Sequence, residues 1–265
     1  MLTFSTASSS TLSSIHPTPS VRRAASLRKT WRTLVTGAVL TAAAIAQPAF
    51  AAPADSMIKA VKFDDVSAAE KLLAQGVDPN LVDNTGAPLL VIAAREKSDK
   101  VGALLAANPK TDLEKLDPAG ENAMMLAALN DDVTFVNMLI AKDAEVNKKG
   151  WTPLHYAATN GHDDVVKVLL DHSAYIDSGS PNGTTPLMMA ARGGHLSTVK
   201  LLLDEGADLR LKNQIGMTAV DFAKQYHEKD VAEGLAARLA SMQGAGPSGT
   251  SGASGVPQTG ANGAK

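Results

Sequence analysis

The chain has 265 residues, a formal net charge of −2 and no cysteine. The lack of cysteine excludes disulfide bonds, thiolate zinc sites and cysteine nucleophiles. Because aromatic residues make up only 4% of the chain, the core must be built from aliphatic side chains and methionine, which suits thin helical layers.

The first 51 residues have the organisation of an export signal. They contain five basic residues and no acidic one. An apolar run of 13 residues, Leu34–Ala46, precedes Ala49-Phe50-Ala51, the small-x-small pattern that signal peptidase cleaves. The run is shorter than the roughly 20 residues that cross a bilayer. We therefore predict a cleaved signal peptide over residues 1–51 and no membrane span in the mature chain.

Two destinations are compatible with this signal. The favoured one is the periplasm of a Gram-negative bacterium. The acid-free, Ser-rich start also fits a bipartite transit peptide, which would lead to the thylakoid lumen. Arg22-Arg23 resembles the start of a twin-arginine signal, but the Ala-Ala-Ser that follows at residues 24–26 matches that motif poorly.

Removal of the signal makes the chain acidic. Of the 25 basic residues, 20 remain against 27 acidic ones, a net charge of −7. A chain with this charge has no electrostatic basis for binding nucleic acid or an anionic membrane.

The remainder of the chain repeats itself about every 33 residues. Glycines recur at residues 86, 120, 150, 183 and 216, and two copies agree almost position for position. One reads Gly-Trp-Thr-Pro-Leu-His-Tyr-Ala-Ala over residues 150–158, and the next reads Gly-Thr-Thr-Pro-Leu-Met-Met-Ala-Ala over residues 183–191. Such a period indicates a stack of supersecondary units, in which each unit buries its apolar face against the next.

Each unit predicts a turn followed by two helices. Asp or Ser, with Pro tolerated second and Gly following, is typical of a type I turn. Thr152 or Thr185 then caps a first helix whose first position is Pro. The second helix carries one apolar stripe, as in Val165, Val166 and Leu169. Pairs of small residues allow neighbouring first helices to pack closely; they are Ala93-Ala94, Ala127-Ala128, Ala157-Ala158 and Ala190-Ala191.

This pattern resembles the ankyrin repeat over residues 54–242, and with its signal the chain is similar to exported, periplasmic bacterial ankyrin repeat proteins. The resemblance implies an all-α solenoid of about six helix-turn-helix repeats, four internal and two capping, with short hairpin fingers. Atypical terminal copies are expected, because a cap must present a polar outer face. The expected repeats span residues 54–85, 86–119, 120–149, 150–182, 183–215 and 216–242. Residues 243–265 are Gly- and Ser-rich, which predicts a disordered tail.

One finger is shorter than the others. Between the third repeat and Gly150 the chain reads Asn-Lys-Lys over residues 147–149, and three residues of the usual finger are missing. We therefore expect a truncated finger at this junction and a notch in the row of fingers.

The sequence shows no constellation for catalysis. It lacks a phosphate-binding loop and paired histidines at helical metal-ligand spacing. The resemblance implies that His155, His162 and His195 are structural. The acidic doublets at residues 64–65 and 131–132 precede second helices, where carboxylates satisfy free amides. We therefore predict that the protein is not an enzyme and uses no catalytic residue, cofactor or metal.

The resemblance implies a binding module that grips a protein partner through its concave face, formed by the fingers and the first helices. We expect a monomeric adaptor or scaffold; an inhibitor or immunity protein that neutralises one envelope enzyme or toxin is the alternative. Trp151 is the predicted anchor, because tryptophan is a usual hot-spot residue, although it would also cover the notch. The predicted contact residues are Trp151, Arg95, Glu96, Glu121, Leu129, Asn130, Thr159, Asn160, Thr184, Arg192, Met217, Gln225 and Tyr226.

Overall fold

The computed structural model describes residues 51–244, which form twelve α-helices and no strand. The predicted signal peptide, apart from its last residue, and the predicted tail from residue 245 onward lie outside the described residues. The helices are α1 Ala51–Lys62, α2 Val66–Ala74, α3 Leu89–Glu96, α4 Asp99–Ala107, α5 Ala123–Leu129, α6 Val133–Ile140, α7 Pro153–Asn160, α8 Asp163–Asp171, α9 Pro186–Arg192, α10 Leu196–Asp204, α11 Ala219–Gln225 and α12 Lys229–Gly244.

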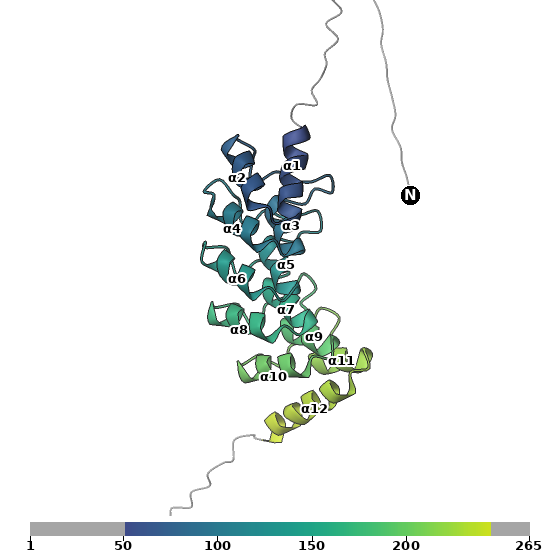
Figure 1. Ribbon diagram of the computed structural model, residues 1–265. Helices are drawn as coiled ribbons and strands as arrows, with labels where there is room; N and C mark the ends of the chain where they lie inside the picture. Colours follow the sequence, from purple (N-terminus) through teal and green to yellow (C-terminus); the bar gives the residue numbers. More distant parts are fainter. Residues whose placement is uncertain (1–50, 245–265) are drawn as a thin grey trace, which may run out of the picture. The chain divides into compact units, whose positions relative to one another are not determined.

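Consecutive helices pair, and the pairs stack in one row (Figure 1). The odd-numbered helices α1 to α11 pack on one another and form one layer, and the even-numbered helices α2 to α12 form the other. The expected all-α solenoid is therefore confirmed. Residues 51–244 form six such pairs, of which the first begins at Ala51 and the last ends at Gly244.

The helices begin where the sequence supplies caps. The side chain of Thr185 accepts from the amide of Met188, and Thr152 forms a capping box with His155. The carboxylates of Asp65 and Asp132 cap α2 and α6 in the same way. These contacts satisfy amides that a helix start otherwise leaves unpaired.

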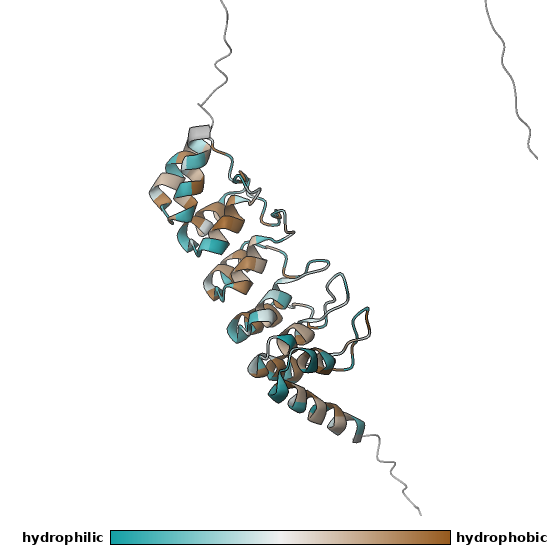
Figure 2. Cartoon of the chain, turned by 90° about the vertical axis from the view of Figure 1, so that its right-hand side faces the viewer, coloured by the Kyte–Doolittle hydropathy of each residue, from teal (hydrophilic) through white to brown (hydrophobic). Residues whose placement is uncertain are grey.

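Each pair of helices is joined to the next pair by a finger that projects to one side of the stack (Figure 2). Four fingers close through the same backbone hydrogen bond, which joins residues 83 and 87, 117 and 121, 180 and 184, and 213 and 217 at 2.9–3.0 Å. The turn glycines have positive φ, for example +85° at Gly86, a conformation that side chains with a Cβ rarely adopt.

The finger between α6 and α7, the third in chain order, lacks this closure and is truncated as expected. No backbone bond joins residues 147 and 151, although both belong to the described part of the chain. The turn glycines show the consequence. Gly86 lies against Pro118 of the next finger and Gly150 lies against Pro181, whereas nothing lies within 4 Å of a Cβ built on Gly120. The finger that ends at Gly120 therefore borders the predicted notch.

The core is continuous along the stack, because every layer buries its apolar residues against the next. The paired alanines of α3, α5, α7 and α9 are fully buried. In the outer layer, the Phe135 ring of α6 lies where a Cβ on Gly102 of α4 would clash, so this glycine is needed for close packing. None of the helices formed by residues 51–244 combines the length and apolar character needed to span a bilayer.

We predict that Leu169→Ala and Leu202→Ala each lower the free energy of unfolding by about 2–5 kcal/mol, because each removes a fully buried side chain from α8 or α10. Urea denaturation followed by circular dichroism measures the loss. Leu196→Ala is the matched control, since that side chain of α10 is 49% exposed. Equal losses in the control and the two core variants would contradict the assigned inner face of the second helices.

Candidate functional site

A slot of about 200 Å³ opens on the layer of odd-numbered helices, beside the truncated finger. Most of its walls are apolar or aromatic, and they come from three consecutive repeats. The lining residues are Leu129 of α5, Trp151, His155, Tyr156 and Thr159 at α7, and Met189 of α9. The predicted contact residues Leu129, Trp151 and Thr159 therefore meet in one place.

Trp151 forms an accessible wall of this slot. Its side chain is 37% exposed. The indole packs edge-on against the His155 ring, with ring centroids 5.3 Å apart and an angle of 76° between the planes. Trp151 thus covers the histidine with one edge and presents other atoms to the slot, so covering and binding do not exclude each other.

His155 ties the slot to the next finger. Its Nε2 lies 2.9 Å from the carbonyl oxygen of Thr184, which can only accept, so Nε2 carries the proton. Its Nδ1 accepts from the hydroxyl of Thr152 at 2.8 Å. Burial lowers the pKa of His155 to about 4, because the cation would lose its hydration inside the stack. The expected structural role of this histidine is confirmed.

Tyr156 links the slot to a carboxylate. Its hydroxyl donates a hydrogen bond to Oε1 of Glu121 at 2.9 Å. Burial, followed by this bond and the charge of Glu121, raises the pKa of Tyr156. Within residues 51–244, Glu121 forms no ion pair with a lysine or arginine.

Two predicted cations are already engaged. The guanidinium of Arg95 lies 3.2 Å from a carboxylate oxygen of Asp117, a buried residue of the second finger. The guanidinium carbon of Arg192 lies 4.9 Å from the ring centroid of Tyr226, at cation–π distance. Both arginines therefore already have a partner within the chain.

Two of the predicted polar side chains hold one repeat to the next, and a third bonds within its own helix. The side-chain amide of Asn130 donates to the carbonyl of Ala94 at 3.1 Å, and that of Asn160 donates to Leu129 at 3.0 Å. Thr159 donates to the carbonyl of His155 within α7 at 2.7 Å. These three side chains contribute to the scaffold of the face.

His162 and His195 have the expected structural role. The Nε2 of His162 lies 2.9 Å from the carbonyl of Leu129, and the Nε2 of His195 lies 2.9 Å from that of Thr159. Each ring therefore joins the start of a second helix to the repeat before it.

Thr184 was a wrong choice as a contact residue. It is only 2% exposed, and its backbone amide and carbonyl bond to Ser180 and His155. The position after a turn glycine is therefore accessible in some repeats and buried in others. Among the other predicted residues, Glu96 and Gln225 are exposed and Met217 is half-buried.

The predictions from sequence missed Tyr156 and Met189. Each lies three residues before a predicted position, Thr159 and Arg192 respectively, and so shares the same helix face. Helical spacing applied to those two positions would have found them.

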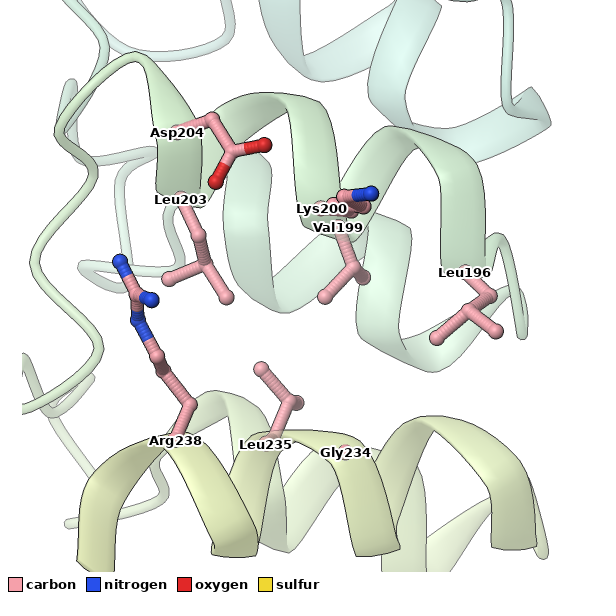
Figure 3. A pocket seen from close by; sticks show the side chains of 8 residues that line it. All are labelled: Leu196, Val199, Lys200, Leu203, Asp204, Gly234, Leu235 and Arg238. Atoms are coloured by element: carbon pink, nitrogen blue, oxygen red, sulfur yellow. The ribbon is translucent and has the colours of Figure 1, made fainter. Parts of the chain in front are cut away.

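A second apolar groove, of about 300 Å³, lies between α10 and α12. Figure 3 shows Leu196, Val199 and Leu203 of α10 pointing toward α12, and Leu235 pointing back. This groove contains none of the predicted contact residues.

Comparison with known families gives the same repeat. The family model for ankyrin repeats (three copies) matches this sequence over residues 57–149, 90–180 and 174–243. The chain belongs to the ankyrin repeat family. Ankyrin repeats imply that this chain takes part in protein–protein interaction.

Relatives share parts of this repeat array. A putative ankyrin repeat protein of Escherichia coli, YahD, is 30% identical over 125 residues, covering 46% of this chain and 61% of the relative. Protein phosphatase 1 regulatory subunit 27 of Mus musculus is 30% identical over 88 residues, covering 32% and 56%. The palmitoyltransferase AKR1 of Lachancea kluyveri is 29% identical over 121 residues, covering 43% and 16%. The chain thus spans less than two thirds of each of these relatives.

A solved structure also has this fold. It is the complex of the predatory endopeptidase Bd0816 from Bdellovibrio bacteriovorus with the immunity protein Bd3460. One of its chains is 29% identical with a TM-score of 0.61, and the match covers 69% of this chain and 97% of that chain.

We predict that stability depends on the protonation of His155. Because its folded-state pKa lies near 4 and an unfolded histidine titrates near 6.5, the folded state binds fewer protons between these values. The contribution of neutral His155 to the free energy of unfolding is therefore fully present above pH 6.5. It is lost as the pH is lowered toward 4, and the total loss is about 3 kcal/mol. Urea denaturation at successive pH values measures this dependence.

The test variant is His155→Met, because methionine occupies the equivalent place at Met188. Its stability should vary less with pH between 7 and 4 than that of the unchanged protein. His172→Asn is the control, since His172 is exposed. An unchanged dependence in His155→Met would show that another group is responsible.

Proposed function

We propose that this protein is a non-enzymatic binding module that grips one protein partner through its concave face, centred on the slot beside Trp151. The observation that carries the proposal is the slot itself. It combines an accessible tryptophan with apolar walls on a face whose other polar side chains are largely held by neighbours. Interfaces commonly use such an apolar anchor surrounded by polar residues.

The polar groups of the slot support a binding role without catalysis. Both ring nitrogens of His155 are engaged, and the hydroxyl of Tyr156 is bound to Glu121. A general base needs a free lone pair within reach of a substrate proton, and the His155 ring has none to offer because Nδ1 already accepts and Nε2 carries the proton.

The proposed site of action is an extracytoplasmic compartment, with the periplasm favoured over the thylakoid lumen. The support comes from the basic start, the apolar run of residues 34–46 and the small-x-small pattern at residues 49–51.

The second candidate function is an inhibitor or immunity protein that neutralises a single enzyme. The observation that favours it is the likeness to a chain of the complex between an endopeptidase and its immunity protein. An inhibitor would bind one enzyme tightly and abolish its activity, whereas an adaptor would leave the activity of its partner intact. Assay of the recovered partner with and without this protein separates the two candidates.

We predict that the mature protein begins at Ala52 or within two residues of it. N-terminal sequencing of the protein purified from the soluble envelope fraction measures this directly. Ala51→Leu should block cleavage, because signal peptidase requires a small residue at that place. Recovery of an uncut chain with residues 34–46 in the membrane fraction would show an anchored protein instead.

We predict that Trp151→Ala weakens partner binding by about 2 kcal/mol or more, the magnitude of a hot-spot residue. The partner is recovered by pull-down from envelope extract and identified by mass spectrometry. Calorimetric titration of that partner gives the affinity, and circular dichroism confirms that the variant is folded.

Leu196→Ala is the matched control, because it removes an exposed leucine from the groove between α10 and α12. It should leave the affinity unchanged. A folded Trp151→Ala variant with undiminished affinity, or a loss confined to Leu196→Ala, would place the binding surface elsewhere on the protein.

A further inference from the structure

We propose that the slot beside Trp151 receives a basic side chain, lysine or arginine, from the partner. The aliphatic stem would lie between Leu129, Trp151 and Met189, and the cationic end would reach the carboxylate of Glu121. The inference rests on the proposed function, because it names the chemistry that the concave face recognises.

The dimensions and walls of the slot suit one long side chain. Its volume of about 200 Å³ is below the roughly 300–1,000 Å³ of sites for small-molecule ligands. Leucine and methionine walls can accept the methylene stem of a lysine or arginine, which buries well against apolar surface. The Trp151 ring adds an aromatic surface, which attracts a nearby cation.

A carboxylate lies next to the slot. Tyr156 lines the slot and donates to Oε1 of Glu121 at 2.9 Å, so the carboxylate lies at the hydroxyl end of that ring. The neighbouring carboxylate of Asp117 is neutralised by Arg95, whereas Glu121 has no cation partner within residues 51–244. A cation from outside would complete this site.

The truncated finger leaves open space next to Glu121, which is itself half-buried. Glu121 directly follows Gly120, the turn glycine beside which the short finger leaves open space. In the other repeats with a following finger, Pro118, Pro181 or residues 213–214 occupy that space. A partner segment can therefore approach Glu121 through the notch.

The net charge of the mature chain also favours a basic partner. Residues 52–265 have a net charge of −7, which favours encounter with a basic surface. A cation-accepting slot and an acidic chain thus select the same class of partner segment, an exposed loop that carries a lysine or arginine.

The test uses four small probes and the indole N–H signal of Trp151 in two-dimensional NMR. The signal is assigned by its loss in Trp151→Phe. The probes are the amides of N-acetyl-arginine, N-acetyl-lysine, N-acetyl-norleucine and N-acetyl-glutamate. Norleucine has the stem of lysine without its amine. We expect saturable shifts with the two basic probes, at an affinity about fivefold or more above that of norleucine, and none with glutamate.

Glu121→Gln is the test variant, because its amide oxygen still accepts from Tyr156 while the charge is removed. The advantage of lysine over norleucine should disappear in this variant. It should persist in Glu233→Gln, the matched control, which removes the charge of an exposed carboxylate on α12, away from the predicted contact residues. In the unchanged protein, higher salt should reduce the same advantage, because screening weakens the attraction between exposed charges.

Equal affinity for lysine and norleucine, or an advantage that survives in Glu121→Gln, would overturn the inference. A slot to which no probe binds would overturn it as well. The proposed function fails by a different result, namely a folded Trp151→Ala variant that binds the recovered partner normally. The two failures are therefore distinguishable.

Discussion

The close approach of neighbouring first helices is the constraint on which this structure depends. No helix pair can bury its apolar faces alone, so each layer takes its core from the layers beside it. Fully buried alanine pairs in α3, α5, α7 and α9 permit that approach. A larger side chain at these places would separate the layers and open the continuous core. The fingers would then lose their spacing, and the slot would lose its walls, which come from three repeats.

A second set of contacts fixes the register of the layers. One polar side chain in each of the first four fingers accepts from a backbone amide of the next loop. Asn80 accepts from Asp112 at 2.7 Å, and Glu114 accepts from Glu145 at 2.8 Å. Asn147 of the truncated finger accepts from Tyr175 at 2.8 Å. The short finger therefore loses its tip and keeps its connection, so the notch can exist without interrupting the stack.

The candidate site follows from these two features together. Regular stacking places Leu129, Trp151 and Met189 at one point of the face, and the missing finger residues leave open space beside Gly120, which directly precedes Glu121. His155 contributes by bonding to the carbonyl of Thr184, which fixes the ring against which the indole packs. The absence of three finger residues thus gives one repeat a surface that the otherwise similar repeats do not have.

The sequence by itself determined the repeat, the paired helices, their caps and the short finger, because these depend on local patterns such as Thr-Pro, Ala-Ala and the spacing of glycines. It also singled out Trp151. Tertiary structure decided which side chains of the face remain free. Residues 121, 151 and 184 occupy equivalent positions, yet Trp151 is exposed, Glu121 reaches Tyr156, and Thr184 is buried. Accessibility depends on the neighbouring repeat and finger, and those distances exist only after the layers have packed.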